Sequence, residues 1–221
     1  MMPRSTLLVL ALAAGTVSAH AQSAGQWLLK AGVNRIEPQV SSGDLSAPSL
    51  PGSKIDVKSA TSAILTATYF VTDRFSVEAY AGLPYEHDIV GDGAIQGVGK
   101  IGSAKQVAPT VFAQWRFLEP QSAARPYVGL GLTYAYFYGE KGSAALTALT
   151  NPGGDATRMS VDSAWGLSPQ IGLTVKLSDR WALDASVIKT YLKTKATLST
   201  GQTIDTKLDP LSTNLSLVYS F

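Results

Sequence analysis

Two neighbouring stretches decide the fold: A-P-T-V-F-A-Q-W-R-F at residues 108–117 and P-Y-V-G-L-G-L-T-Y-A-Y-F-Y-G at residues 126–139. In the first stretch, apolar side chains fill every second position from Val111 to Phe117. In the second they do so from Val128 to Tyr138, and mostly small residues lie between them. A period of two held over about ten residues is the repeat of a β-strand, so the two stretches predict a hairpin.

Aromatic side chains border both apolar faces of this hairpin. Trp115 and Phe117 lie beside the turn, and Tyr134, Tyr136 and Tyr138 lie at the far end. In a soluble sandwich such a face packs on a second sheet and needs no aromatic border. A face in lipid carries aromatic rings at both water interfaces. The hairpin is therefore interpreted as two adjacent strands of a transmembrane barrel.

The first residues are typical of a secretory signal peptide rather than of a folded segment. Arg4 gives a positive start, residues 7–14 are apolar, and Ala19-His20-Ala21 forms a small-x-small cleavage site. The apolar run is too short to span a bilayer as a helix. We predict that residues 1–21 are removed after Ala21 and that residues 22–221 form one barrel domain.

Composition agrees with an exported membrane barrel. Charged residues make up 15% of the chain, against about 25% in typical soluble domains. No apolar run after the leader reaches the ~18 residues of a helical span. There is no cysteine, and the formal net charge of +2 gives no reason to expect a nucleic acid partner. Export without a helical span favours the outer membrane as the location.

The alternating pattern predicts eight antiparallel strands, at residues 27–35, 59–71, 75–89, 108–117, 126–139, 163–177, from 181 onward, and 208–221. Short turns at 72–74, 118–125 and 178–180 alternate with long loops. In bacterial barrels the short turns are periplasmic and the long loops extracellular. We expect loops without strands at 38–58, 91–103 and 197–204, and a short helix at 144–149 within the remaining loop.

Several strings are similar to those of a known family. A-P-T-V-F-A-Q-W-R-F (108–117), R-P-Y-V-G-L-G-L-T-Y (125–134), D-S-A-W-G (162–166) and L-D-P (208–210) with a terminal Y-S-F resemble the OmpW family. The resemblance covers essentially the whole chain after the leader. One departure is Val218, where the family tends to have glycine. The resemblance implies an eight-stranded outer-membrane barrel with a narrow, partly apolar lumen that passes small hydrophobic compounds.

If the aromatic-bordered side of each strand faces lipid, the other side faces the lumen. Five charged residues then converge near the periplasmic end from five strands: Lys30, Glu78, Arg116, Lys176 and Asp184. An unpaired charge in a narrow lumen costs several kcal/mol. The sequence therefore predicts a plug of salt bridges there, although a small barrel also fills its interior with ion pairs for stability alone.

Higher on the lumen faces, apolar residues interrupt the polar pattern: Ile64, Tyr80, Phe112, Phe137, Ile188 and Leu192. These residues either pack the interior or form an apolar upper lumen that suits a hydrophobic ligand entering from outside. Such a ligand would not cross the charged plug cheaply. A sideways exit between strands is then expected at Pro109 or Pro169, because each lacks a backbone donor.

The aromatic girdles are predicted to contain Trp27, Tyr69, Trp115, Tyr134, Tyr136 and Trp181. Lys189 falls on the lipid side and must lie close enough to an interface for its ammonium to reach water. The terminal Phe221, with Tyr219 on the same side, resembles the signal that the outer-membrane assembly machinery recognises.

Catalytic and metal motifs are scarce. His87 is followed by Asp88, but a lone histidine beside an acid is more often solvated than catalytic. No metal-ligand cluster, phosphate loop or cofactor motif is visible. We expect no enzyme activity, no metal and no cofactor.

The sequence predicts an outer-membrane barrel, monomeric or weakly oligomeric, that takes up small hydrophobic molecules through an apolar lumen or pocket. Its expected partners are the bilayer, those small molecules and the assembly machinery. The alternative is a structural or receptor barrel with an inert lumen and functional extracellular loops.

Overall fold

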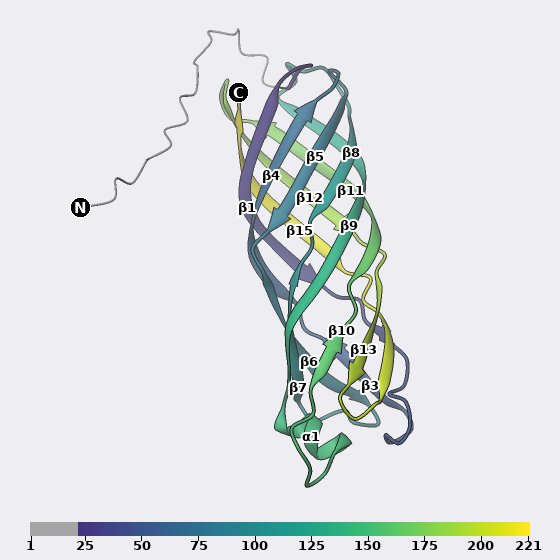
Figure 1. Ribbon diagram of the computed structural model, residues 1–221. Helices are drawn as coiled ribbons and strands as arrows, with labels where there is room; N and C mark the ends of the chain where they lie inside the picture. Colours follow the sequence, from purple (N-terminus) through teal and green to yellow (C-terminus); the bar gives the residue numbers. More distant parts are fainter. Residues whose placement is uncertain (1–21) are drawn as a thin grey trace, which may run out of the picture.

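The computed structural model describes residues 22–221 as a closed antiparallel barrel, and the predicted signal peptide lies outside the described residues (Figure 1). β15 pairs with both β12 and β1, and β9 pairs with both β8 and β11, so the ring has no free edge. The predicted eight-stranded barrel is confirmed. Its strands are β1 (Trp27–Glu37), β4 (Ala60–Phe70), β5 (Phe75–Gly82), β8 (Thr110–Arg116), β9 (Ala124–Gly142), β11 (Ala164–Lys176), β12 (Trp181–Lys189) and β15 (Leu211–Ser220).

The barrel wall extends beyond the part that lies in the membrane, at the end opposite to residues 22 and 221 (Figure 1). β6 (Tyr85–Gly93) continues the line of β5 and pairs with β7 (Lys100–Val107) and β3 (Ser53–Val57). A second sheet contains β2 (Ser41–Ser42), β10 (Met159–Val161), β13 (Lys193–Leu198) and β14 (Thr203–Lys207). Because long connections of such barrels are extracellular, this half is the extracellular section.

The expectation of strandless loops at 38–58, 91–103 and 197–204 was wrong in part. β3 lies inside the first range, β7 begins in the second, and β13 and β14 enter the third. These segments are short and are interrupted by glycine, proline and serine. They nevertheless pair as β-strands and pack around one apolar core. The predicted helix is confirmed as α1 (Ala144–Thr150), whose first turn is capped by the Ser143 side chain.

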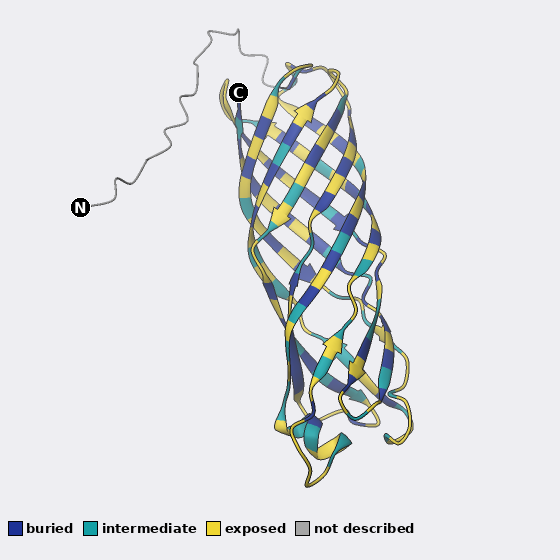
Figure 2. Ribbon diagram, viewed as in Figure 1, coloured by how far each residue is buried: buried dark blue, intermediate teal, exposed yellow. Residues whose placement is uncertain are grey.

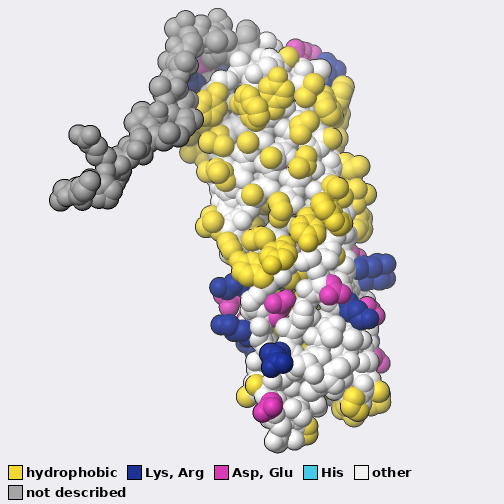
Figure 3. Space-filling view, in the orientation of Figure 1, with side chains coloured by type: hydrophobic (Ala, Val, Ile, Leu, Met, Phe, Trp, Pro, Cys, Tyr) yellow, Lys and Arg dark blue, Asp and Glu magenta, His cyan; other side chains and the backbone are white. Residues whose placement is uncertain are grey.

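Burial alternates along every barrel strand, so one set of side chains faces inward and the other outward (Figure 2). The outward set forms an apolar belt around the end that carries the chain termini, and charged groups begin below it in the view of Figure 3. Its exposed members include Val33, Leu65, Val111, Leu132, Ile171 and Leu215. Within residues 22–221, no helix is long and apolar enough to cross a membrane.

The main apolar core lies in the extracellular section rather than in the barrel. It contains Ile89, Ile95, Ile101, Ala104, Leu146 and Leu198, all at most 6% exposed. The lumen within the belt is instead filled mainly by polar side chains, among them Thr66, Gln114, Thr133, Ser168, Gln170 and Asn214. The two halves of the molecule therefore have opposite interiors.

Candidate binding cavity above a sealed lumen

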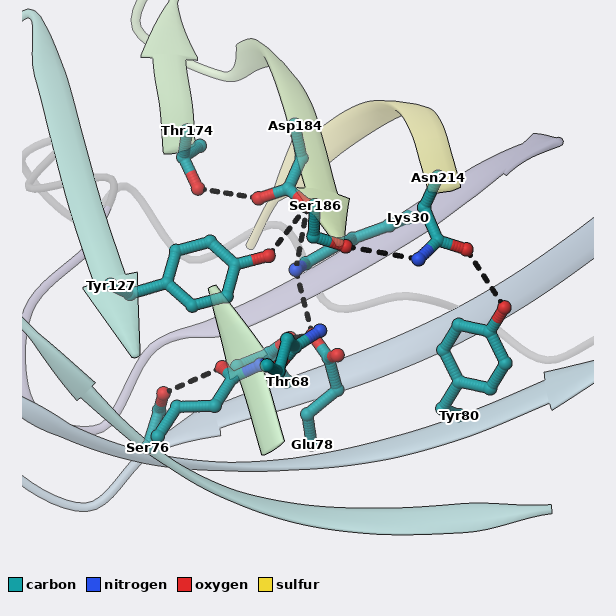
Figure 4. A network of polar contacts seen from close by, with 12 residues as sticks. Lys30, Thr68, Ser76, Glu78, Tyr80, Tyr127, Thr174, Asp184, Ser186 and Asn214 are labelled. Atoms are coloured by element: carbon teal, nitrogen blue, oxygen red, sulfur yellow. Dashed lines mark hydrogen bonds and ion pairs between the residues drawn. The ribbon is translucent and has the colours of Figure 1, made fainter. Parts of the chain in front are cut away.

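A buried ion triad occupies the periplasmic half of the lumen (Figure 4). The Lys30 Nζ lies 2.7 Å from the Glu78 Oε2 and 3.3 Å from the Asp184 Oδ1. Hydroxyl groups satisfy the carboxylates further: Thr68 donates to Glu78 at 2.7 Å, and Thr174 donates to Asp184 at 2.6 Å. A buried ion pair persists only where its remaining lone pairs also find partners, and this triad meets that condition.

Two arginines complete the floor of the lumen. Arg116 is fully buried, and its Nη1 donates to the Thr174 Oγ1 at 3.0 Å. Its guanidinium also stacks over the Tyr127 ring, 4.6 Å from the centroid. Arg125 is equally buried and donates to the backbone carbonyls of Gln22 at 2.7 Å and Asp73 at 2.6 Å. Neither arginine forms a salt bridge within residues 22–221, so hydrogen bonds and ring faces hold both charges.

The structure places Lys176 outside this floor. Its Nζ lies 3.1 Å from the Asp179 Oδ1 in the adjoining turn, and its side chain is 34% exposed. The last residue of β11 has the inward parity that the sequence pattern gives it, but a long side chain at the rim reaches water. The buried charges are thus Lys30, Glu78, Arg116 and Asp184, with Arg125 in addition.

An apolar layer lies on the periplasmic side of the charges. Leu28, Phe70, Ala182 and Val218 pack together there, each at most 5% exposed. Val218 stands at the position where the resemblance leads us to expect glycine. Its side chain fills this layer and points away from lipid.

Polar side chains also close the lumen on the extracellular side of the triad. The Asn34 Nδ2 donates to the Asn214 Oδ1 at 2.6 Å, and the Tyr80 hydroxyl donates to the same oxygen at 2.9 Å. The Tyr85 hydroxyl donates to the Asn34 Oδ1 at 2.8 Å. Tyr80, predicted as part of an apolar lumen, therefore belongs through its hydroxyl to a polar layer.

A chain of hydroxyl groups crosses the lumen at about the same height. Thr110 bonds Thr133 at 2.7 Å, Thr133 bonds Ser168 at 2.6 Å, and Ser168 bonds Thr190 at 2.9 Å. The chain joins β8, β9, β11 and the end of β12. Together with the layers on its periplasmic side, this chain places hydrogen-bonded polar side chains across the lumen at several heights.

On the extracellular side of the polar filling, at the lower end in the view of Figure 1, lies an apolar cavity of about 100 Å³. Its wall comes from β3, β6, β7, α1, β13 and β14, and includes Ile55, Ile89, Ile101, Leu146, Leu198 and Ile204. Leu50 and Leu149 also line it and are 60% and 39% exposed, so the cavity reaches the outer surface.

The predicted apolar lumen residues divide among three places. Phe137 and Leu192 line the apolar cavity. Tyr80, Ile188 and again Leu192 line a smaller cavity of about 40 Å³ beneath it. Ile64 and Phe112 are buried at 5% and 1% exposure and pack the barrel interior. Most of the cavity wall was not predicted, because it comes from segments expected to be loops.

The smaller cavity lies where the β5–β8 ladder breaks. The last β5–β8 pair is Tyr80 with Thr110, and pairing resumes between β6 and β7 at Tyr85 with Gln106. Pro109 occupies the first position after the break, and its carbonyl accepts from the Tyr134 backbone N–H of β9 at 3.0 Å. Leu83, in the connection between β5 and β6, is 64% exposed. The wall is therefore interrupted between a cavity and the outer leaflet.

A second, narrower break lies beside Pro169. The β11–β12 ladder ends at Gln170 with Ile188. One isolated bridge, Leu167 with Tyr191, follows beyond the gap. Pro169 itself pairs with Leu130 on β9, so its missing donor affects only one edge.

The predicted girdle residues lie on the outside of the barrel at two heights. Trp27, Trp115 and Trp181 are 50%, 46% and 44% exposed at the periplasmic end, and Tyr69 is 37% exposed beside Trp27. At the other border Tyr136 is 47% exposed, and Tyr134 lies against Trp165 with 4.8 Å between ring centroids.

Two further predicted positions lie at these borders. Lys189 bonds the backbone carbonyl of Asp209 through its Nζ, so its ammonium is satisfied at the outer border. Tyr219 packs between Trp181 and Phe221, with 4.9 Å between ring centroids on each side.

The histidine and its neighbouring acid do not form a catalytic pair. The His87 Nδ1 lies 2.8 Å from the Lys58 carbonyl oxygen. Asp88 points to the other face and pairs with Lys100. Within the described part of the chain, no group of three or more potential ligands is arranged to hold a metal ion.

A closed antiparallel barrel with a lipid-facing apolar belt, aromatic borders and a polar interior defines an outer-membrane β-barrel protein. Comparison with known proteins narrows the class. The family model described as the OmpW family matches residues 23–221, and the chain belongs to this family. The protein is therefore a barrel embedded in the outer-membrane bilayer.

Individual relatives are similar over nearly their whole length. Outer membrane protein W of Vibrio cholerae is 32% identical over 204 residues, covering 90% of this chain and 89% of that protein. Outer membrane protein W of Escherichia coli is 31% identical over 223 residues, covering 97% and 99%. The crystal structure of OprG from Pseudomonas aeruginosa superimposes with a TM-score of 0.82 at 27% identity, covering 92% of this chain and 99% of that one.

Proposed function

We propose that the protein takes small apolar molecules from outside the cell into the extracellular cavity and releases them sideways into the outer membrane. The observation that carries this proposal is the position of the cavity. It is apolar, it reaches the outer surface beside Leu50 and Leu149, and it ends on a lumen packed with polar groups.

Passage along the barrel axis is unfavourable for an apolar solute. It would have to separate the hydroxyl chain at Thr133, then the amide pair of Asn34 and Asn214, and then the triad at Lys30. Each separation leaves buried polar groups without partners, which costs about 1–3 kcal/mol per neutral group and more for a charge. The charged floor acts as a plug in this scheme.

Sideways release has a shorter route. The smaller cavity adjoins the large one at Leu192, which lines both. It also contains Tyr80, Ala108 and Thr110 at the edge of the broken β5–β8 ladder. Opening the wall there breaks few backbone hydrogen bonds because the β5–β8 pairing has already ended at Tyr80 with Thr110. We assign the exit to this break rather than to the narrower one at Pro169.

The test is the initial rate of toluene uptake by cells that produce the protein, compared with cells carrying an empty vector. The variant Tyr80→Asp with Ile188→Asp places two carboxylates in the smaller cavity and should reduce uptake to the vector level, because apolar solutes avoid unpaired charges. Ile188→Val is the matched control and should keep most of the uptake. Unchanged uptake in a correctly inserted double variant would refute the proposal.

The alternative function is a structural or receptor barrel with an inert lumen. The extracellular second sheet, β2, β10, β13 and β14, is regular enough to serve as a recognition surface. Uptake equal to the vector level for the unmodified protein favours this alternative.

We also propose that Tyr219 and Phe221 form the assembly signal. Both rings lie on the outside of the closing strand at the periplasmic border, where another protein can reach them. Deleting Phe221 should lower the fraction of chains inserted in the outer membrane. Val218→Gly, which changes the inward face beside it, is the control for loss of packing alone.

A further inference from the structure

A ring nitrogen of His87 is one of the buried polar atoms without a partner in the wall of the apolar cavity. His87 is 4% exposed and lines the cavity beside Ile89, Ile101 and Ala104. Its Nε2 atom is buried and has no partner with hydrogen-bonding geometry among residues 22–221, although the Gln106 side chain lies near the ring. Buried polar groups are nearly always paired in folded proteins, so an unpaired one needs an explanation.

The chemistry of this nitrogen is fixed by the other side of the ring. The His87 Nδ1 faces the Lys58 carbonyl oxygen at 2.8 Å. A carbonyl only accepts, so the proton of a neutral ring resides on Nδ1 and Nε2 carries a lone pair. Burial holds the pKa of His87 below its ordinary 6.5, which keeps the ring neutral at neutral pH. The Tyr85 ring, stacked 6.3 Å away, further fixes the orientation.

Other polar atoms of the cavity wall do not substitute for this acceptor. Ser49 and Thr206 also line the cavity with unpaired hydroxyl oxygens, but a hydroxyl rotates and both donates and accepts. The imidazole Nε2 accepts a hydrogen bond but cannot donate one, and its lone pair points in one fixed direction. A water molecule in this place would need two or more polar partners to be held well, and the surrounding wall is mainly aliphatic, with Gln106 among its few polar members.

We propose that His87 Nε2 is the hydrogen-bond acceptor of a subsite for small apolar molecules that carry one hydroxyl group. The inference rests on the proposed function and deepens it by naming the substrate class. The hydrocarbon part of such a molecule contacts Ile89, Ile101 and Leu146, and its O–H donates to the imidazole. A cavity of about 100 Å³ is of the order of one that admits a benzene-sized molecule.

Phenol and toluene are the probes, because they differ mainly in a hydroxyl group against a methyl group. His87 is the only histidine of residues 22–221, so ¹⁵N-histidine labelling of the mature protein in lipid nanodiscs gives one imidazole to follow. Phenol should shift the Nε2 resonance upfield, as acceptance of a hydrogen bond requires, and toluene should leave it nearly in place. Both probes should shift the methyl resonances of Ile89 and Ile101.

The outcomes separate the two proposals. If neither probe shifts the Ile89 and Ile101 methyl groups, the cavity does not bind apolar molecules and both proposals fail. If both probes shift the methyl groups but the Nε2 resonance responds equally to each, only the hydroxyl subsite fails.

A variant pair adds an independent test. His87→Leu should lower the affinity ratio of phenol to toluene about fivefold, the scale of one net hydrogen bond. Ile101→Val trims the same wall without touching a polar atom and should leave that ratio unchanged. An unchanged ratio in His87→Leu overturns the inference, and the labelled unmodified protein decides the matter if that variant does not fold.

Discussion

The barrel lumen and the extracellular section are enclosed by the same continuous wall, yet their interiors are opposite. Within the membrane belt the inside is mainly polar and extensively hydrogen-bonded, and Lys30 is 2% exposed in its periplasmic half. In the extracellular section the inside is aliphatic and encloses a cavity. The outsides are reversed in the same way, since lipid contacts the first section and water the second. Each section buries the side chains that its surroundings would solvate poorly: polar side chains in the section that lipid surrounds, and apolar side chains in the section that water surrounds.

The opposite interiors of the two sections also suit them to different roles. Inward polar groups of a barrel need partners from water or from protein, and in the belt section neighbouring side chains supply most of them, as Glu78 and Asp184 do for Lys30. The extracellular section is free of that constraint and can hold an apolar space. The proposed uptake depends on the boundary between the two sections, where the β5–β8 ladder ends beside Pro109.

The largest effect should come from breaking the ion triad. Lys30→Met leaves Glu78 and Asp184 buried without their cation, and loss of one member of a buried pair costs about 3–5 kcal/mol. Urea unfolding in lipid vesicles measures this loss. Arg74→Met removes an exposed pair with Glu119 and should cost at most about 1 kcal/mol. Equal losses in the two variants would contradict a tightly bonded lumen.

Neutralising the whole triad sharpens this prediction. Lys30→Met combined with Glu78→Gln and Asp184→Asn leaves no ionised group unpaired, so stability should recover in part relative to Lys30→Met alone. Further loss in the triple variant would show that the destabilisation arises from packing and not from charge. The same vesicle assay gives the comparison.

Filling the cavity should remove uptake without loosening the barrel. Ala196 lines the cavity and is 6% exposed, so Ala196→Phe places a ring where the solute would lie. Toluene uptake should fall to the vector level, while the urea midpoint of the membrane section changes little. Ala196→Val is the matched smaller change and should keep partial uptake. Full uptake in the phenylalanine variant would exclude this cavity from the route.

A smaller effect is expected at the proposed exit. Pro109→Ala adds a backbone donor beside the break, on the edge that faces β9, and should slow toluene uptake without abolishing it, because it stabilises the strand that must move. Pro126→Ala changes an exposed proline near the periplasmic end of β9 and should have no effect. A slower rate only in Pro169→Ala would move the exit to the β11–β12 break.

The smallest effect is a pH dependence from His87. Because its folded pKa lies below 6.5, the unfolded chain binds more protons in the interval between the two values. The free energy of unfolding should therefore be unaffected above 6.5 and fall as the pH drops towards the folded pKa. The nearby groups are the Tyr85 ring, the Gln106 side chain and the Lys58 carbonyl, while the Lys58 ammonium pairs with Asp56. His87→Leu should remove this slope in a pH series of unfolding curves.

The belt section could be predicted from the sequence because lipid imposes a strict alternation. The parity of Val111, Trp115 and Leu132 identified the strands, and the inward positions of Lys30 and Asp184 followed from it. Arg125 escaped prediction because it stands beside a turn, where no pattern indicates whether a long side chain folds inward.

The cavity could not be predicted because its wall has no single period. Ile55, Ile101 and Leu198 come from short segments separated by glycine and serine, and they meet only through pairing distant in sequence. One usable signal was present: K-I-D-V at residues 54–57 contains a short apolar alternation, Ile55 and Val57.

Xenon under pressure tests the opposition of the two interiors most directly, because its anomalous scattering marks apolar space in a crystal. We expect xenon density in the extracellular cavity, between Ile101, Leu146 and Leu198, and none along the axis between Thr133 and Lys30. Density beside Lys30 or Asn214, or an extracellular cavity without xenon, would contradict this expectation.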